Sequence, residues 1–372
     1  MTETFELDLT AMTHGGRALG RHEGRPIFVP FGIPGERVRV RITQDKRSYA
    51  FAAVEAVITP SAERVEPRCK HFGICGGCHW QQIDYAAQLR FKRDVVIEQM
   101  ARIGGLRDAL VHPTIASPDP WLYRSHVTFH VTSAGRLGFV AVDDRTIIPI
   151  DECYLIRPEL SDWFERLKQK RFQPGERVRL QVGSAAASAA ASAADKLIAR
   201  SGSNAEPDDE ANVASTDKVT YRIKQRGFQV TGGSFFQVNL PQAETLVDLV
   251  LNRLDLRGDE RVLDLYSGVG LFTAFLAERS RRVTAVEVYA PAVRDAESNL
   301  ADLSNVDFRV GTTEAVLSAH KIRVDAAVID PPRAGMKPKA LAALIACQPR
   351  KIAYVSCDPS TLARDARLLV AA

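Results

Sequence analysis

The sequence predicts an α/β protein with a C-terminal doubly wound parallel sheet, a small N-terminal β-barrel and a β-rich region between them. From about residue 240, expected strands alternate with helical patterns, which is typical of a parallel sheet with helices on both faces. Residues 1–60 alternate apolar and polar side chains between glycine-containing turns, as in a small antiparallel barrel. We therefore expect three domains, over residues 1–60, 61–239 and 240–372.

Composition excludes several classes of protein. The chain has 372 residues, of which 45% are hydrophobic and 25% charged, as in an ordinary globular protein. No apolar run reaches the length of a membrane span, and the N-terminus lacks the pattern of a signal peptide. Six cysteines are too few for a disulfide framework in so long a chain. We expect a cytoplasmic monomer that has no membrane partner, and a net charge of +4 permits a polyanionic one.

The expected barrel carries a stripe of arginines. In the run Arg-Val-Arg-Val-Arg-Ile, the two-residue period of a strand puts Arg37, Arg39 and Arg41 on one face. The apolar residues between them then face the barrel interior. An arginine stripe can follow the phosphates of a nucleic acid, but a solvated outer face explains it equally well.

Three cysteines lie within ten residues, and a fourth follows in the middle region. Cys69, Cys75 and Cys78 form the first group, and Cys153 is the fourth candidate. Four thiolates suit either a four-iron cluster or a structural zinc ion. Zinc sites usually contain two short Cys-x-x-Cys pairs, and only Cys75 and Cys78 have this spacing, so we favour the four-iron cluster. Buried structural cysteines are the remaining interpretation.

The middle region is expected to contain one long helix and several strands. The helix runs over 85–103 and is stopped by two glycines; it is a candidate to pack on the C-terminal domain. A stretch of about 184–217, rich in Ala, Ser, Asn and Asp, has too little bulky apolar surface to order itself and is expected to be a disordered insertion. The expected strands cover 124–131, 137–142, 177–182 and 219–223.

The first strand of the C-terminal domain leads into a glycine-containing loop. Asp264 is followed by Gly268 and Gly270 before a helical pattern, and Glu287 ends the next expected strand. A dinucleotide-binding loop would have a third glycine where Thr273 stands. An acidic residue at the end of each of these two strands is typical instead of a loop that holds S-adenosylmethionine. A purely structural turn is the alternative.

Two later strands end in polar motifs that should meet in one cleft. The expected strand 324–329 ends in Asp330-Pro-Pro-Arg333, and strand 351–356 ends in Ser-Cys357-Asp-Pro359. A helix beginning at Pro359 presents its positive end to Cys357, which favours the ionised thiol. Addition of a thiolate to C6 of uracil makes C5 nucleophilic, and a base must then remove the C5 proton. Cys357 is the candidate nucleophile, whereas Cys347 is expected to be a packing residue.

Several of these motifs together resemble the RNA uracil-5-methyltransferase family. The resemblance covers nearly the whole chain and implies a Rossmann-like methyltransferase domain. The chain looks closest to the branch with an N-terminal TRAM barrel and a four-iron cluster, which includes the bacterial 23S ribosomal RNA enzyme. The motifs that carry it are Cys-x5-Cys-Gly-Gly-Cys, Ser-Phe-Phe-Gln237-Val-Asn239, Asp-Leu-Tyr-Ser-Gly-Val-Gly, Asp-Pro-Pro-Arg and Ser-Cys-Asp-Pro.

The resemblance implies roles for individual residues. Cys357 would be the nucleophile, and a uridine in structured RNA, with 23S ribosomal RNA ahead of transfer RNA, would be swung out of its stack to reach it. The methyl donor would contact Gln237, Tyr266, Glu287 and Asp330, beside Asp264, Gly268 and Gly270. Cys69, Cys75, Cys78 and Cys153 would hold a [4Fe-4S] cluster. Arg37, Arg39, Arg41 and Arg124 would contact RNA.

The sequence departs from the family in two places. Thr312 stands where the family commonly has an acid near the adenine, so this contact is not carried over. The family also continues beyond the equivalent of Arg364 and Asp365 with two strands and a glutamate base. We expect this chain to lack those strands, which leaves the apolar strand 351–356 at the sheet edge. Alternatives are a tRNA uracil-5-methyltransferase, a catalytically incomplete RNA-binding iron–sulfur protein, and an amino-group methyltransferase.

Overall fold

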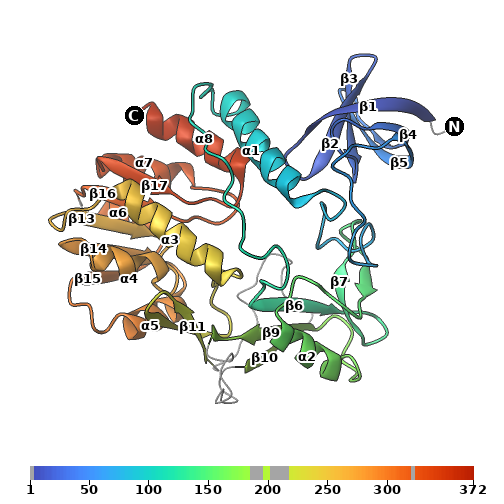
Figure 1. Cartoon of the computed structure of the whole chain (residues 1–372). Helices are drawn as coiled ribbons and strands as arrows, with labels where there is room; N and C mark the ends of the chain where they lie inside the picture. The colour runs from blue at the N-terminus through green and yellow to red at the C-terminus, as the bar shows by residue number, and fades with distance from the viewer. Residues whose placement is uncertain (1–3, 185–195, 202–217, 320–322) are drawn as a thin grey trace. The chain divides into compact units, whose positions relative to one another are not determined.

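The computed structural model describes residues 4–184, 196–201, 218–319 and 323–372 (Figure 1). The chain forms two compact units. The first contains residues 1–116 and 139–152, and the second contains residues 117–138 and 153–372. The division predicted from the sequence, with boundaries near residues 60 and 240, stays a prediction.

The first unit begins with a closed five-stranded barrel in the order β1-β2-β3-β5-β4. Its pairs are antiparallel except for β3 with β5, which run parallel. Alternate side chains such as Val38 and Val40 point inward and are fully buried, as the two-residue period predicts. The strands are β1 (Thr4–Met12), β2 (Arg17–His22), β3 (Arg25–Pro30), β4 (Arg37–Asp45) and β5 (Ala50–Thr59).

Helix α1 (Tyr85–Arg102) packs on the barrel. The Asp84 side chain caps its first turn by accepting hydrogen bonds from the amides of Ala86 and Ala87. Ala87 and Val95 are buried in a cluster with Met12 and Ile33 of the barrel. The predicted helix is confirmed, whereas its expected packing on the C-terminal domain stays a prediction.

The second unit begins with antiparallel strands. Strand β6 pairs with β9 and, through His130 and Gly138, with β7, while β11 and β12 form a separate hairpin. Helix α2 lies against β9, where Phe164 stacks on Phe129 with ring centroids 4.8 Å apart. The elements are β6 (His126–Val131), the start of β7 (Leu137–Val140), α2 (Pro158–Leu167), β9 (Arg177–Val182), β10 (Lys196–Ser201), β11 (Lys218–Ile223) and β12 (Arg226–Thr231). The end of β7 and all of β8 (Ile147–Pro149) belong to the first unit.

A five-stranded parallel sheet forms the rest of the second unit, in the order β15-β14-β13-β16-β17. The chain builds outward from β13 through β14 to β15, and then crosses to the other side of β13 for β16 and β17. Between β13 and β16 lies the switch point of the topology, where open α/β sheets bind their ligands. The strands are β13 (Arg261–Leu265), β14 (Arg282–Glu287), β15 (Val306–Val310), β16 (Ala326–Ile329) and β17 (Lys351–Tyr354).

Helices cover both faces of this sheet (Figure 1). One face packs against α3, α4, α5 and the β11–β12 hairpin, and the other against α6, α7 and one residue of α8, Leu369. The predicted doubly wound architecture is therefore confirmed. The helices are α3 (Leu240–Leu254), α4 (Leu271–Ala277), α5 (Ala290–Asn299), α6 (Thr313–Ala319), α7 (Pro338–Ala346) and α8 (Pro359–Val370).

The segment that was expected to be disordered contains a short strand. Residues 196–201, inside the expected insertion, form β10 and pair antiparallel with β9, whereas residues 185–195 and 202–217 lie outside the described part of the chain. Within the described part of the chain, strand β17 lies at the edge of the parallel sheet and pairs with β16 alone. Of the helices in the described residues, none combines the length and the apolar character needed to cross a membrane.

Candidate active site

Four loops with polar side chains meet at the carboxyl end of the parallel sheet. Residue pairing places Leu265 beside Val286 on one side and beside Ile329 on the other, and Ile329 beside Tyr354. The loops that follow β13, β14, β16 and β17 therefore leave the sheet from the same edge. The predicted residues Tyr266, Asp330 and Cys357 lie on three of these loops, and Glu287 is the last residue of β14, just before the fourth.

The loop after β13 is built to bring its backbone close to Glu287. Tyr266, Gly268 and Gly270 all have positive φ, of 64°, 54° and 89°, a conformation that costs glycine little. The Gly268 amide donates to Oε2 of Glu287 at 3.0 Å, and the Tyr289 amide donates to Oε1 at 2.8 Å. A Cβ on Gly270 would lie 2.7 Å from the Leu300 side chain. Glycine is thus required here both by the turn and by packing against α5.

Buried carboxyl groups beneath this loop are poorly compensated. Asp264 is fully buried, and its Oδ2 accepts a hydrogen bond from Thr273, whereas its Oδ1 has no hydrogen-bond partner among the described residues. Burial raises the pKa of Asp264 to about 7, helped by the neighbouring Asp330 and Glu287. Burial likewise raises the pKa of Asp330 to about 6. Shifted acids in a cleft at a switch point are typical of a functional site.

This arrangement fits S-adenosylmethionine. Oδ1 of Asp264 accepts no hydrogen bond from the described residues, and the sulfonium and ammonium groups of S-adenosylmethionine carry positive charge that would offset the three carboxyl groups. Glu287 is the last residue of β14, a position where an acid can accept hydrogen bonds from ribose hydroxyls. When bound, the ligand supplies an electrophilic methyl group. The protein groups that would hold it are Tyr266, Gly268, Glu287 and Asp330.

Cys357 lies on the connection between β17 and α8, at the same edge of the sheet, and is exposed. The next residue, Asp358, caps α8 by accepting hydrogen bonds from the amides of Ser360 and Thr361, both at 2.9 Å. The thiol therefore stands just before a well-formed helix start, where a helix favours negative charge. Cys347, by contrast, is buried at the end of α7, and its Sγ contacts the Ala343 carbonyl oxygen at 3.3 Å. The contrast between the two cysteines agrees with the prediction.

A cluster around Asp365 joins α8 to strand β17 and to the loop after β16. Asp365 is buried, and its Oδ2 accepts from the Tyr354 hydroxyl at 2.7 Å and from the Met336 amide at 2.8 Å. Arg364 forms an ion pair with the same carboxylate and donates to the Ala334 carbonyl at 3.0 Å. Helix α8 thereby binds the loop after β16 and the strand that leads to Cys357. Sequence analysis missed this role, because a charged pair in an amphipathic helix usually faces solvent.

A second buried aspartate holds the loop that contains Gln237. Asp295 of α5 accepts hydrogen bonds from the Thr231 amide at 2.8 Å and hydroxyl at 2.9 Å, and pairs with Lys218 at 3.1 Å. Gln237 itself is half-buried, and its contact with the methyl donor stays a prediction. The neighbouring Phe235 exposes 57% of its surface. An exposed aromatic ring in this loop is a feature that the sequence pattern did not single out.

The arginines predicted to contact RNA differ in their surroundings. Arg37, Arg39 and Arg41 do lie on the outer face of β4, but each has an acidic neighbour. Arg37 and Arg39 lie 3.0 and 3.8 Å from Glu6, and Arg41 lies 3.0 Å from Glu55. The stripe is thus partly neutralised. Arg124 is half-buried beside His126, whose pKa is lowered by burial and by the Arg179 and Arg124 charges.

The predicted cluster ligands are not assembled into a metal site. Cys69, Cys75, Cys78 and Cys153 are all half-buried, the first three in the first unit and Cys153 in the second. Among the described residues, no group of three or more His, Cys, Asp or Glu side chains is arranged to hold a metal ion. Gly76 is explained by packing of the backbone instead, because a Cβ at this position would lie 2.9 Å from the Val140 carbonyl oxygen. The geometry therefore does not support a [4Fe-4S] cluster.

Comparison with protein families gives two matches. The profile described as tRNA (Uracil-5-)-methyltransferase matches residues 186–371, and the TRAM domain profile matches residues 2–54. The first range contains the loop after β13 and Cys357. The second contains most of the barrel. The TRAM profile supports the predicted identity of the barrel.

Comparison with individual proteins agrees with the profiles. An uncharacterised RNA methyltransferase of Synechocystis is 30% identical over 98% of this chain and 89% of its own length. One from Clostridium tetani is 32% identical over 98% of this chain and 90% of its own. The crystal structure of Pyrococcus abyssi tRNA (uracil-54, C5)-methyltransferase with S-adenosyl-L-homocysteine has a TM-score of 0.72 and 23% identity, covering 97% of this chain and 92% of that one. This last match shows the same fold.

Proposed function

The chain belongs to the RNA uracil-5-methyltransferase family, whose members use S-adenosylmethionine, and from this premise we propose that it methylates C5 of a uridine in structured RNA through a covalent bond to Cys357. The observation that carries the proposal is an exposed cysteine at the end of β17, beside the loop of Asp330. An aromatic uracil C5 is a weak nucleophile, so a thiol at this position has a chemical purpose.

The proposed reaction begins at the Cys357 sulfur. Its thiolate adds to C6 of the uracil, and the ring electrons move to form an enolate whose C5 attacks the methyl group. S-adenosylhomocysteine leaves, a base removes the C5 proton, and the re-formed C5–C6 double bond expels the thiolate. Asp330 and Glu287 would orient the donor. The target base must leave its stack to reach the exposed thiol.

We favour 23S ribosomal RNA over transfer RNA as the substrate. The support is the sequence resemblance to the branch with a TRAM barrel and clustered cysteines, of which the bacterial ribosomal RNA enzyme is a member. Transcripts of a 23S ribosomal RNA domain and of a tRNA, each labelled with tritium at uracil C5, distinguish the two. Tritium release that depends on S-adenosylmethionine identifies the substrate, and release from tRNA alone would contradict our preference.

A non-catalytic RNA-binding function is the second candidate. The TRAM barrel favours it as well as the first, because RNA binding needs no chemistry at Cys357. Tight binding of RNA by the wild-type chain, with no tritium release under any condition that permits S-adenosylmethionine binding, would support this alternative. Release that Cys357→Ala abolishes would support the enzyme.

The [4Fe-4S] cluster is a separate proposal that rests on cysteine spacing alone. Cys69, Cys75, Cys78 and Cys153 supply the four thiolates that such a cluster requires. No step of the proposed reaction needs it. Anaerobic purification followed by metal and sulfide analysis tests the proposal: iron and sulfide at about four per chain would support it, and zinc without sulfide would reject it.

A further inference from the structure

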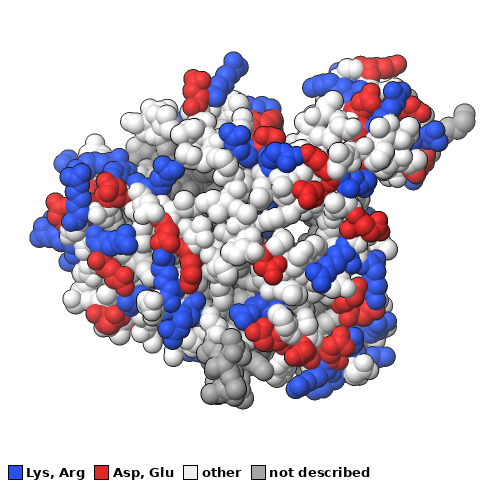
Figure 2. All heavy atoms as spheres, viewed as in Figure 1, with Lys and Arg blue, Asp and Glu red and all other residues white. Residues whose placement is uncertain are grey.

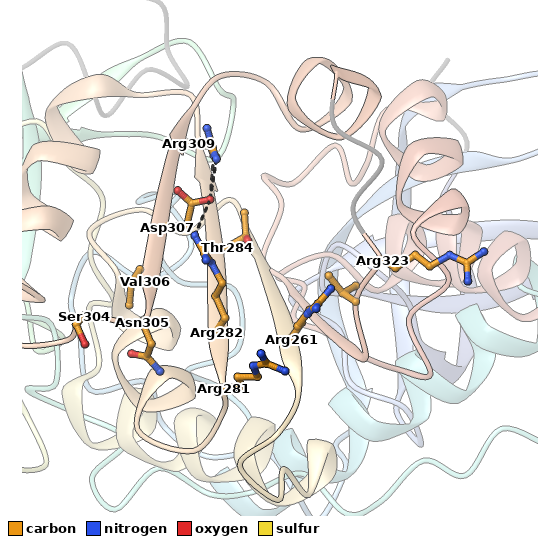
Figure 3. Close-up of a pocket in the computed structure, with 11 residues that line it drawn as sticks. Arg261, Arg281, Arg282, Thr284, Ser304, Asn305, Val306, Asp307, Arg309 and Arg323 are labelled. Atoms are coloured by element: carbon orange, nitrogen blue, oxygen red, sulfur yellow. Dashed lines mark hydrogen bonds and ion pairs between the residues drawn. The ribbon is translucent and has the colours of Figure 1, made fainter.

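A basic cavity of about 600 Å³ lies at the amino end of the parallel sheet, the end opposite to the methyl-donor loop (Figure 3). Arg261 and Arg282 are the first residues of β13 and β14, and along the edge strand β15 the lining extends as far as Arg309. All of the lining lies in the second unit. It consists of Arg261, Arg281, Arg282, Thr284, Ser304, Asn305, Val306, Asp307, Arg309, Arg323 and Val324.

The cavity lining holds a large excess of positive charge. Five arginines and one aspartate give it a formal charge of 5 − 1 = +4, which equals the net charge of the whole chain. Figure 2 shows Lys and Arg gathered at the left of the second unit, near the strands that Figure 1 labels β13, β14 and β15. Such a concentration of like charge costs free energy through mutual repulsion unless an anion offsets it.

Acidic neighbours do not neutralise this charge. Asp307 lies between two of the arginines, 2.9 Å from Arg309 and 3.8 Å from Arg282 (Figure 3). Arg261, Arg281 and Arg323 are exposed, and among the described residues no carboxylate lies within ion-pair distance of their side chains. Three guanidinium groups are therefore free to bind an anion.

The two other acids at this edge are engaged elsewhere. The carboxylate of Glu260 accepts hydrogen bonds from the amides of Arg257 and Gly258, each at 3.0 Å. Asp325 accepts from the Arg261 amide at 2.9 Å and pairs with Arg350 at 2.9 Å. These acids hold the backbone in place and leave the arginine side chains uncompensated.

The floor of the cavity is held rigidly. Asn305 donates from Nδ2 to the carbonyl oxygens of Ala277 at 2.8 Å and Ser280 at 3.0 Å. The Arg281 and Arg282 amides in turn approach the Glu260 carbonyl, the former at 2.9 Å. The turn that carries Arg281 and Arg282 is thereby fixed before any ligand arrives, which lowers the entropic cost of binding.

We propose that this cavity binds backbone phosphates of the substrate RNA, away from the methylated nucleotide; the inference rests on the proposed RNA substrate. Guanidinium groups match phosphate oxygens with paired hydrogen bonds and need no particular base. The arginines come from several strand starts, so they suit a chain of phosphates better than a single one. A free phosphate ion would share this chemistry, and the experiment below separates the two.

The position of the cavity predicts which RNAs it engages. The uridine that reacts at Cys357 lies at the carboxyl end of the sheet, whereas the cavity lies at the amino end. RNA that contacts both must pass around the edge of the domain, and β15 forms one such edge. A short single strand that carries only the target uridine cannot do this. We therefore expect the cavity to raise the affinity for large, folded RNA more than the affinity for short fragments.

The test compares two triple variants of the full chain. Arg261→Ala, Arg281→Ala and Arg323→Ala remove the unpaired arginines of the cavity. Arg166→Ala, Arg171→Ala and Arg294→Ala make the same charge change at exposed positions outside it. Binding is measured to a structured 23S ribosomal RNA domain and to a short oligouridine at several salt concentrations. Circular dichroism melts confirm that both variants fold.

We expect the cavity variant to bind structured RNA about tenfold more weakly near 0.1 M salt, with a slope of log affinity against log salt lower by about 2. Its affinity for the oligouridine should stay within about twofold of the control variant. Lysines at the same three positions should restore most of the slope, because they keep the charge. Equal affinities and slopes for the cavity and control variants would overturn the inference.

Two further outcomes separate this inference from the proposed function. Saturable binding of inorganic phosphate that the cavity variant loses, with unchanged RNA binding, would overturn the RNA assignment. A wild-type chain that methylates RNA, together with a cavity variant that behaves like the control, would overturn only this inference. A wild-type chain that binds no RNA would overturn the proposed function and this inference with it.

Discussion

The two ends of the parallel sheet carry opposite charges in opposite environments. At the carboxyl end, Asp264 is buried and Asp330 is half-buried, and their pKa values are raised to about 7 and about 6. At the amino end, Arg261, Arg281 and Arg323 are exposed to solvent. Burial makes a charge expensive and sensitive to its neighbours, whereas exposure leaves it screened by water and salt. One end is therefore suited to selective chemistry, and the other to broad attraction.

This difference predicts how large the effect of a substitution will be at each place. A change at the carboxyl end alters a preorganised site, in which single atoms decide the rate. A change at the amino end or on the barrel removes one of several screened charges and reduces affinity by a small factor.

The largest effect is expected from Cys357→Ala. Loss of the only sulfur proposed to bond with the base should reduce methyl transfer by at least about 10⁴-fold, while RNA affinity changes little. Transcripts containing 5-fluorouridine should form a covalent complex with the wild-type chain, visible as a band shift in denaturing gels. The band should be absent in the variant.

Cys347→Ala is the matched control for this prediction. Cys347 is buried in α7 and contacts the Ala343 carbonyl, so its substitution should lower stability slightly and leave the covalent band intact. A band that persists in Cys357→Ala would assign the nucleophile elsewhere. The carboxyl end of the sheet would then lose its proposed role in the reaction.

Asp365→Asn should have the next largest effect. The substitution keeps the shape of the side chain but removes the charge that pairs with Arg364, and it disturbs the bonds from Tyr354 and Met336. We expect a loss of about 1–3 kcal/mol of unfolding free energy and a fall in kcat of about tenfold or more, since the Cys357 and Asp330 loops lose their common support.

Tyr354→Phe serves as the control for Asp365, because it removes one of these hydrogen bonds and leaves the carboxylate in place. Its effects on the melting temperature and on kcat should be smaller. A positioning role requires kcat to fall more than RNA affinity does. An equal fall in stability with unchanged kcat would show that the cluster is only structural.

The sequence indicated which candidate residues lie together at one sheet edge, but not which residues support them. Asp264 and Glu287 lie in the last two residues of their strands, Asp330 and Cys357 follow theirs, and the parallel topology brings strand ends together without any knowledge of packing. Asp365 could not be found in this way, because its partners Met336 and Tyr354 lie 29 and 11 residues away along the chain. Such a contact depends on how a helix docks, not on local pattern.

Other misses have a similar cause. The arginine stripe of β4 was predicted correctly as a face, but its partners Glu6 and Glu55 come from β1 and β5 and depend on strand register. Strand β10 was not expected, because it is a six-residue strand within a polar segment. Its pairing with β9 stabilises it, and this pairing cannot be read from the local pattern. Side-chain alternation reveals a face, whereas partners across strands appear only in the folded chain.

The pH dependence of Asp264 sharpens the comparison by using burial itself. Its pKa rises from an ordinary 3.8 to about 7 in the folded chain, so the folded state binds more protons than the unfolded state between these values. The unfolding free energy of the ligand-free chain should therefore fall as pH rises from about 4 to about 7. Binding of S-adenosylmethionine should strengthen over the upper part of this range, because the ionised carboxyls attract its positive charge.

Asp264→Asn should flatten the pH dependence of the melting temperature by several degrees relative to the wild-type chain. Calorimetric scans at pH 5, 6, 7 and 8 measure this, and titrations with S-adenosylhomocysteine and S-adenosylmethionine at each pH separate the charged ligand from its neutral-sulfur product. An exposed acid gives the contrasting control: Asp162→Asn in α2 should leave the profile unchanged. Identical profiles for Asp264→Asn and the wild type would refute the raised pKa.

The barrel arginines should give a smaller effect. Arg37, Arg39 and Arg41 are partly neutralised by Glu6 and Glu55, so their joint substitution by alanine should weaken RNA binding only about three- to tenfold. Removing the acids instead, by Glu6→Gln and Glu55→Gln, should strengthen binding slightly. Filter binding at low and high salt measures both changes. A shallower dependence of log affinity on log salt in the arginine variant, together with a steeper one in the acid variant, would confirm that the pairs compete with phosphate for the arginines.

The smallest expected effect has the opposite sign and lies at the amino end of the sheet. Among the described residues, Asp307 is the one acid that lines the basic cavity, where it lies 2.9 Å from Arg309 and 3.8 Å from Arg282. Asp307→Asn releases both guanidinium groups and raises the formal charge of the lining by one. Structured RNA should then bind about two- to threefold more tightly at low salt and equally well at high salt, because screening removes the difference. Asp162→Asn changes the net charge identically outside the cavity, so equal gains in the two variants would mean that only total charge matters and that the cavity is not a binding site.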